Sequence, residues 1–296
     1  MTLRHLRIFV VVYQEMSITK AAEKLHLAQP SVSLAVKELE EEYQIRLFDR
    51  INRHLAATEK GIRFYDYAIH ILELTEEMDH AMTSPEVPEK LKIGSSITVG
   101  NFLMPCVVRD FHEKYSSCQV RVTIQNSGRV IQAVSKNDQD LGVVEGQVCH
   151  DQLVQLPFME DRLYFLCGQN HPLAGKEKVG LDEICEYPLF LREEGSASRE
   201  ITEGLLKAYQ VKGKICWESV SNQALIEAVK ENPGITVLSG RLVEKELQEG
   251  SVRILPLYPK AFLRNFSLIY HRKKYLTEPL RYLMELFQKV GEKEKG

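Results

Sequence analysis

Apolar residues in the first part of the chain recur at helical spacing in three blocks. Leu6, Phe9, Val10 and Tyr13 follow the i, i+3, i+4, i+7 pattern of one helix face, which predicts an amphipathic helix over residues 3–15. Ala21, Ala22 and Leu25 form the second block, behind Ser17 or Thr19 as the cap. Val32, Val36 and Leu39 form the third block after a break at residues 26–28. The last two blocks therefore predict two short helices joined by a tight turn.

The second of these short helices has a face that is free to meet a partner. Ala21 and Ala22 are small enough for the two helices to pack closely, and Pro30 fits a first helical turn, where its missing N–H costs nothing. The face turned away from this contact carries Gln29, Pro30, Ser31, Ser33, Leu34 and Lys37. This layout is typical of a helix-turn-helix that lies in the major groove of double-stranded DNA, with Gln29 and Ser33 at base edges.

A basic turn follows the two short helices. Residues 45–48 and 55–58 are short extended candidates on either side of a polar segment, which predicts a two-stranded wing. The wing carries Arg50, Arg53 and His54, and we expect these side chains to contact DNA phosphates. A solvated turn without a partner is the alternative, and the neighbouring helix-turn-helix favours phosphate contact.

One long helix is predicted to begin at residues 58–61. Its apolar residues alternate steps of three and four, which is a heptad pattern: Phe64, Tyr67, Ile71, Leu74, Met78 and Ala81. Tyr65, Ile69 and Leu72 form a second apolar line beside it. We expect one line to pack on the DNA-binding domain and the other to pair with a second copy, although a helix buried on its own chain is the alternative. The polar segment at residues 83–88 ends this helix and marks a domain boundary.

From residue 91 the pattern changes to alternating strands and helices, which favours parallel α/β structure. Predicted strands lie at 91–95, 119–125, 141–145, 162–167, 188–191, 214–218, 235–238, 252–257 and 262–271. Predicted helices lie at 100–115, 129–136, 197–209, 222–231, 241–249 and 278–290.

Several segments resemble LysR-type transcriptional regulators. The winged helix-turn-helix of that family is similar to residues 3–72, through Ala21-Ala22-Glu23-x-Leu25, residues 29–33 (Gln-Pro-Ser-Val-Ser), residues 39–41 and residues 47–50 (Leu-Phe-Asp-Arg). The family's effector domain is similar to the remainder, through residues 91–95, 103–105, 140–146, 171–174 and 191–199. Leu34 stands where the family often has a basic residue, and Ala28 stands where a capping serine is common.

The resemblance implies an α/β multidomain protein. Its parts are a winged helix-turn-helix over residues 1–58, a linker and dimerisation helix over 59–90, and an effector domain over 91–296. That domain is expected to resemble a periplasmic binding protein, with lobe one at 91–162 and 268–296 and lobe two at 163–267. The chain would cross between the lobes twice, which makes a hinge.

Three turns are candidates for binding a small molecule, because each joins a strand to a helix, where α/β sheets bind ligands. They contain Ser96 and Thr98, then Ser196, Ser198 and Arg199, and then Ser221, with Asn126 as a further candidate. Hydroxyls, free N–H groups and Arg192 and Arg199 favour an anionic metabolite of unknown identity. Each turn alone could be a plain helix cap, neutral ligands remain an alternative, and the arginines could instead pair with Glu193, Glu194 or Glu200.

Composition excludes other classes of protein. The chain of 296 residues is 44% hydrophobic and 27% charged, which excludes a disordered or fibrous protein. Its net charge of −3 arises in residues 61–90, which hold two basic and seven acidic residues. The six cysteines include no C-x-x-C pair, so neither a zinc site nor a disulfide framework is indicated. No export signal or membrane span is expected, which disfavours a solute-binding transport protein.

The sequence also lacks the common catalytic motifs, including G-x-G-x-x-G, the P-loop, H-E-x-x-H and G-x-S-x-G. The adjacent Cys149 and His150 do not make a catalytic dyad by adjacency alone. We therefore expect a cytoplasmic transcription regulator that is not an enzyme and has no cofactor. Its expected partners are an interrupted inverted repeat in promoter DNA, further copies of itself as a homodimer or homotetramer, and RNA polymerase.

Overall fold

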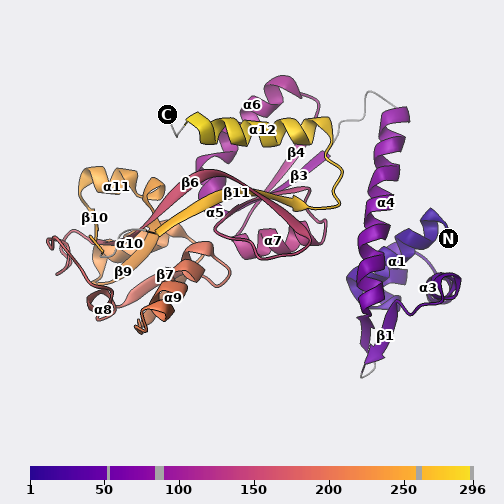
Figure 1. The fold of residues 1–296 in the computed structure, drawn as a ribbon, viewed down its shortest axis with the longest axis horizontal. Coiled ribbons are helices and arrows are strands. Elements are labelled where there is room, and N and C mark those ends of the chain that lie inside the picture. The colour runs from indigo at the N-terminus through magenta and orange to yellow at the C-terminus, as the bar shows by residue number, and fades with distance from the viewer. Residues whose placement is uncertain (52–53, 84–89, 258–261, 294–296) are drawn as a thin grey trace. The chain divides into compact units, whose positions relative to one another are not determined.

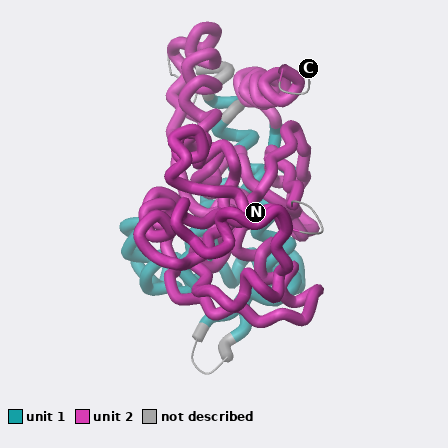
Figure 2. The backbone as a smooth tube through the Cα atoms, turned by 90° about the vertical axis from the view of Figure 1, so that its left-hand side faces the viewer, with its two compact units in different colours: residues 1–88, 273–275 teal, residues 89–272, 276–296 magenta. Residues whose placement is uncertain are grey.

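The computed structural model describes residues 1–51, 54–83, 90–257 and 262–293. The chain divides into two compact units, residues 1–88 with 273–275 and residues 89–272 with 276–296 (Figure 2). Within the described residues, no helix is long and apolar enough to cross a membrane.

The first unit is a small helical domain with a two-stranded wing and a long helix (Figure 1). Its elements are α1 (Leu3–Glu15), α2 (Ile18–Leu25), α3 (Gln29–Tyr43), β1 (Phe48–Ile51), β2 (His54–Ala57) and α4 (Glu59–Thr83). The core joins Leu6 and Phe9 of α1 to Leu39 of α3 and to Tyr65 and Ile69 of α4. The apolar pattern therefore predicted these helices, while the strands lie a few residues from the predicted positions, at 48–51 and 54–57 rather than 45–48 and 55–58.

One side of α4 is used inside this unit and another is exposed. Phe64 packs edge-on against Phe9, with ring centroids 4.9 Å apart, so this residue of the predicted heptad line packs against the core of its own unit. Tyr67, Leu74 and Met78 are 55%, 40% and 57% exposed and form an uncovered apolar line on α4. An apolar line of this length on a helix is a surface that a second helix could cover.

Among the described residues of the second unit, nine strands form one mixed sheet. They are β3 (Lys90–Ser95), β4 (Gln119–Ile124), β5 (Leu141–Glu145), β6 (Leu153–Gly168), β7 (Leu189–Arg192), β8 (Ile215–Ser219), β9 (Ile235–Ser239), β10 (Val252–Ile254) and β11 (Phe262–His271). The order is β4-β3-β5-β11-β6-β9-β7-β8, with β10 beside β6. β3, β4 and β5 run parallel, as the pattern of residues 91–145 predicted, whereas β6, β10 and β11 run antiparallel to their neighbours.

Two lobes form around this sheet because β6 and β11 are long enough to run through both. They pair from Phe262 opposite Leu163 to His271 opposite Leu153. Lobe one contains β3, β4 and β5, and lobe two contains β7, β8, β9 and β10. The predicted strand at 162–167 is therefore the second half of a strand that begins at Leu153.

Helices cover both faces of the sheet in each lobe. Their bounds are α5 (Ile97–Phe102), α6 (Met104–Lys114), α7 (Ser127–Ser135), α8 (Leu181–Ile184), α9 (Ala197–Ala208), α10 (Asn222–Glu231), the 3-10 turn η1 (Gly240–Leu242), α11 (Glu244–Glu249) and α12 (Glu278–Lys293). In lobe one, α6 and α12 pack side by side on one face and α7 on the other (Figure 1). The single helix predicted at 100–115 is two helices, because Pro105 lies in the first turn of α6.

Candidate functional site

The two helices of the helix-turn-helix are defined by their caps. The Ser17 hydroxyl accepts the Lys20 N–H at 3.3 Å and begins α2, and His26 in the left-handed conformation ends it. Ala28 begins α3 without a side-chain cap, and Pro30 occupies the first turn of that helix. A turn of three residues therefore holds α3 across α2 in the way the sequence predicted.

The polar and apolar residues of α3 lie on opposite faces. Val32, Ala35, Val36 and Leu39 are buried against the rest of the unit. Of the residues predicted to contact DNA, Gln29, Pro30, Ser31, Leu34 and Lys37 are exposed and Ser33 is half-buried. Lys37 lies 3.3 Å from the Glu41 carboxylate, so part of its charge is balanced within the helix. The first turns of α3 therefore offer an exposed and mostly uncharged surface.

The wing is tied to α3 by a side chain that the sequence did not single out. One Glu40 oxygen accepts the N–H groups of Leu47 and Phe48, at 2.6 and 3.2 Å. β1 and β2 then pair antiparallel, with Arg50 opposite Leu55 and Ile51 opposite His54. Arg53 and the side chains of Arg50 and His54 lie outside the described part of the chain. The predicted phosphate contacts of these three residues stay predictions.

In lobe one, Ser96 and Thr98 lie at the start of α5 and are 1% and 2% exposed. The Thr98 N–H donates to Glu145 Oε1 at 3.3 Å. Within the described residues the Ser96 hydroxyl has no hydrogen-bond partner, which is unusual for a buried oxygen. At the start of α5, the Ser96 hydroxyl is therefore unused, while the Thr98 N–H already donates to the Glu145 carboxylate.

In lobe two, the predicted cations are paired with carboxylates of the chain. Arg192 forms a two-pronged pair with Glu193, at 2.9 and 3.0 Å. Arg199 is 7% exposed, pairs with Glu203 and lies 3.4 Å from Glu218. Pairing with Glu193 was one of the alternatives, whereas the partners of Arg199 were not foreseen. Neither guanidinium is therefore an unpaired positive charge.

The remaining candidates in this region are serines and an asparagine. The Ser196 and Ser198 hydroxyls lie 3.0 Å apart and are both buried. Ser221 accepts the Ala224 N–H at 3.2 Å and caps α10. This agrees with the alternative that this turn is a plain helix cap. Asn126 likewise accepts the Arg129 N–H at 3.0 Å and caps α7.

The two lobes touch along a seam that we call the glycine seam: Asn126, Gly128 and Gly146 of lobe one against residues 194–197 of lobe two. The Gly128 N–H donates to the Gly195 carbonyl at 2.9 Å, and Asn126 Nδ2 donates to the Glu194 carbonyl at 3.2 Å. A Cβ added to Gly128 would lie 3.3 Å from the Gly195 Cα, and one added to Gly146 would lie 3.4 Å from the Ala197 Cβ. Small residues thus allow backbone-to-backbone contact between the lobes.

A buried charge cluster lies where the strands cross between the lobes, and we call it the Arg264 cluster. Arg264 of β11 donates from Nε to Asp161 Oδ2 of β6 at 2.7 Å and pairs through Nη1 with Glu145 of β5. Asp161 also accepts the Ser239 hydroxyl at 2.7 Å and lies 3.7 Å from Arg241. Arg241 in turn lies over the Phe102 ring of α5, 4.7 Å from its centroid. The cluster therefore connects α5 and β5 of lobe one to β9 and η1 of lobe two.

These charged residues were missed because their partners are far apart in the sequence. Arg264 and Asp161 are separated by 103 positions. Residues 140–146 resemble the effector domain of the family, but their apolar pattern does not indicate that Glu145 faces Thr98 and Arg264. The signal available in the sequence was a carboxylate directly after the apolar run of residues 141–144.

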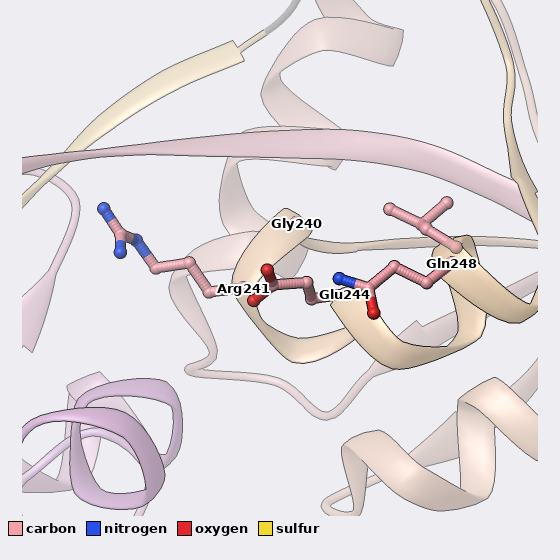
Figure 3. A pocket seen from close by; sticks show the side chains of 5 residues that line it. Gly240, Arg241, Glu244 and Gln248 are labelled. Carbon is pink, nitrogen blue, oxygen red and sulfur yellow. The ribbon is translucent and has the colours of Figure 1, made fainter.

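A hollow of about 440 Å³ lies in lobe two along η1 and α11 (Figure 3). Gly240, Arg241, Glu244, Leu247 and Gln248 line it. None of the predicted effector residues belongs to this lining, whereas Arg241 belongs both to the lining and to the Arg264 cluster.

Comparison with known proteins gives two matching family models. Residues 3–62 match the bacterial regulatory helix-turn-helix protein model of the lysR family. Residues 84–292 match the LysR substrate binding domain. A curated relative, the uncharacterized HTH-type transcriptional regulator YeiE of Escherichia coli, is 32% identical over 284 residues, covering 96% of this chain and 96% of the relative.

Solved structures with low sequence identity share the fold. Full-length OxyR from Pseudomonas aeruginosa matches with a TM-score of 0.68 and 21% identity, covering 98% of this chain and 94% of that chain. The regulatory domain of CcmR from Synechocystis, in complex with 2-PG, matches with a TM-score of 0.63 and 23% identity, covering 69% of this chain and 97% of that chain.

Proposed function

Because the chain belongs to the LysR family of DNA-binding transcriptional regulators with an effector-binding domain, we propose that α3 lies in the major groove of a promoter site. In this proposal Gln29 and Ser33 contact base edges, and Pro30, Ser31 and Leu34 pack against the groove. Lys37, Arg50, Arg53 and His54 contact phosphates.

One observation carries this part of the proposal: the first turns of α3 expose uncharged polar groups while the opposite face is fully buried. Gln29 offers an amide that forms two hydrogen bonds to adenine, which is a base-specific contact. Footprinting of the full-length protein on genomic fragments that it retains tests the proposal. We expect protection of two half-sites about 34 Å apart, related by an interrupted inverted repeat, and a single unpaired half-site would contradict this.

Oligomers are characteristic of the family, and we propose that α4 contributes to self-association as a homodimer or homotetramer. The exposed apolar line of Tyr67, Leu74 and Met78 supports this, because a heptad line on a helix is stabilised by a partner helix.

We also propose that the DNA-bound protein contacts RNA polymerase. Crosslinking of the promoter complex to the polymerase tests that step.

We propose further that a small anionic metabolite binds between the lobes. Ser96 and Thr98 would contact it from lobe one and Ser196, Ser198 and Arg199 from lobe two, with Asn126 and Ser221 at the margin. The unused, buried Ser96 hydroxyl supports this, since a ligand oxygen or N–H would complete its hydrogen bonding. The CcmR regulatory domain, which shares the fold, was solved with 2-PG bound.

Calorimetry of the full-length protein with anionic and neutral small molecules tests this site. The double variant Thr98→Val plus Ser196→Ala should bind the best ligand at least tenfold more weakly than the wild type. Equal binding by the double variant would reject these contacts. Tighter binding of neutral molecules than of anionic ones would reject the anionic class.

The remaining parts of the proposal concern organisation and class. We propose that residues 1–58 bind DNA, that residues 59–90 link and dimerise, and that residues 91–296 bind the effector. Lobe one would be 91–162 with 268–296, and lobe two would be 163–267. We propose that the protein acts in the cytoplasm and regulates transcription without catalysing a reaction.

A further inference from the structure

We propose that Glu145 opposes the binding of anions between the lobes, because its own carboxylate occupies the groups that an anionic effector needs. This inference rests on the proposed effector site at Ser96 and Thr98. It adds a residue that sets affinity and selects ligands by charge.

The position of Glu145 is the first step. It is the last residue of β5, a strand whose five residues are all buried, and its side chain is 8% exposed. One carboxylate oxygen accepts the Thr98 N–H at 3.3 Å, and the other pairs with Arg264 Nη1. The same side chain therefore occupies the donor at the start of α5 and one side of the Arg264 guanidinium.

The second step is that the arginines that the structure describes near this point already face carboxylates. Arg264 is also held by Asp161, through Nε at 2.7 Å, so one guanidinium already faces two carboxylates. Arg241 lies beside Asp161, and Arg192 and Arg199 pair with Glu193, Glu203 and Glu218. An anion that reaches Thr98 would meet the Glu145 charge at short range in a buried site, where like charges repel strongly.

The third step concerns what the site still offers. The Ser96 hydroxyl is 1% exposed and, among the described residues, has no hydrogen-bond partner. A ligand can therefore use Ser96 without displacing any group, whereas use of the Thr98 N–H requires Glu145 to withdraw. Glu145 accordingly lowers the affinity for anions and leaves the affinity for neutral ligands nearly unchanged.

The test compares anion binding by the full-length wild type, Glu145→Gln and Asp161→Asn. Calorimetry at fixed ionic strength uses inorganic phosphate, inorganic sulfate and 2-PG as anionic probes and glycerol as a neutral probe. Gln has the size of Glu and no charge, so Glu145→Gln should bind at least one anion at least tenfold more tightly, with glycerol binding unchanged. Asp161→Asn removes the negative charge of the other carboxylate that contacts the Arg264 guanidinium, and Asp161 does not contact Thr98. This variant should change anion affinity by less than threefold.

Each outcome has one meaning. If the wild type binds an anion and Glu145→Gln binds it within twofold, the role of Glu145 is wrong and the proposed anionic effector stands. If Asp161→Asn raises anion affinity as much as Glu145→Gln does, the role of Glu145 is also overturned. The net charge of the Arg264 cluster would then account for the change in affinity. If no variant binds any anion, both proposals fail.

A second variant covers the case in which Glu145→Gln does not fold. Glu145→Asp keeps the charge and shortens the side chain, which withdraws the carboxylate from the Thr98 N–H. Anion binding should then tighten about threefold, and unchanged or weaker binding overturns the proposal.

Discussion

Gly128 allows the backbones of the two lobes to touch, and the result of replacing it by alanine follows from the structure. The new Cβ would lie 3.3 Å from both the Cα and the carbonyl oxygen of Gly195, and backbone atoms cannot rotate away. The hydrogen bond between Gly128 N–H and the Gly195 carbonyl, 2.9 Å long, should therefore lengthen or break. Such a bond contributes about 0.5–1.5 kcal/mol to stability.

An opposing effect comes from the helix itself. Gly128 lies in α7, where alanine is favoured over glycine by up to about 1 kcal/mol. The two effects offset each other, so Gly128→Ala should change the free energy of unfolding by less than about 1 kcal/mol. Gly204→Ala is the matched control, because Gly204 lies in α9 and an added Cβ meets nothing within 4 Å. The free energy of unfolding of this control variant should rise by about 1 kcal/mol, because only the higher helix propensity of alanine acts there.

Denaturant unfolding and amide hydrogen exchange of the full-length variants measure both effects. We expect Gly204→Ala to be more stable than Gly128→Ala by about 1 kcal/mol. Exchange in residues 126–129 and 194–197 should speed up by several-fold in Gly128→Ala alone. Equal stabilisation of both variants, with unchanged exchange at the seam, would refute the direct contact between the lobes.

Three further predictions concern buried charge, a buried thiol and α4. Arg264→Met leaves the buried Glu145 and Asp161 without the cation that both of them contact, and should lower the free energy of unfolding by about 3–5 kcal/mol in denaturant titrations. A loss below about 1 kcal/mol would contradict this. Burial raises the pKa of the Cys167 thiol to about 11 from 9.0, so stability from this group is complete below pH 9 and is lost as pH rises towards 11; substitution by Ala should remove that part of the pH dependence. Leu74→Glu should shift the oligomer towards monomer in light scattering, and an unchanged mass would reject the α4 interface.

The fold was predictable where one chain segment determines its own structure. The apolar periods of α1, α2 and α3 appear in the sequence at residues that the structure buries or half-buries, because an amphipathic helix needs no distant partner to show its pattern. The first half of β6 was missed because Pro157 interrupts the apolar run, and Pro is depleted in strand interiors. The Pro tolerated there pairs with Ser267, at an irregularity in the β11 register.

The candidate site was predictable in part for the same reason. Serines at the starts of helices are local signals, and Ser96, Ser196 and Ser221 do lie at such starts. The carboxylates that pair with Arg199 and Arg264 depend on strand order, since cross-sheet neighbours such as Arg264 and Asp161 meet only after the sheet has formed. The charge around the candidate site therefore could not be predicted from the turns alone, because it depends on the tertiary fold.

The measurement that tests the central claim most directly is DNA binding by Gln29→Ala and Lys37→Ala at several salt concentrations. Fluorescence anisotropy compares a promoter fragment retained by the wild type with a random fragment of equal length. Gln29→Ala should lose about 1–3 kcal/mol on the promoter fragment and almost nothing on the random one, because it contacts a base edge. Lys37→Ala should weaken both fragments alike and reduce the salt slope by about 1. Equal losses on both fragments for Gln29→Ala would contradict the claim that α3 reads the DNA sequence.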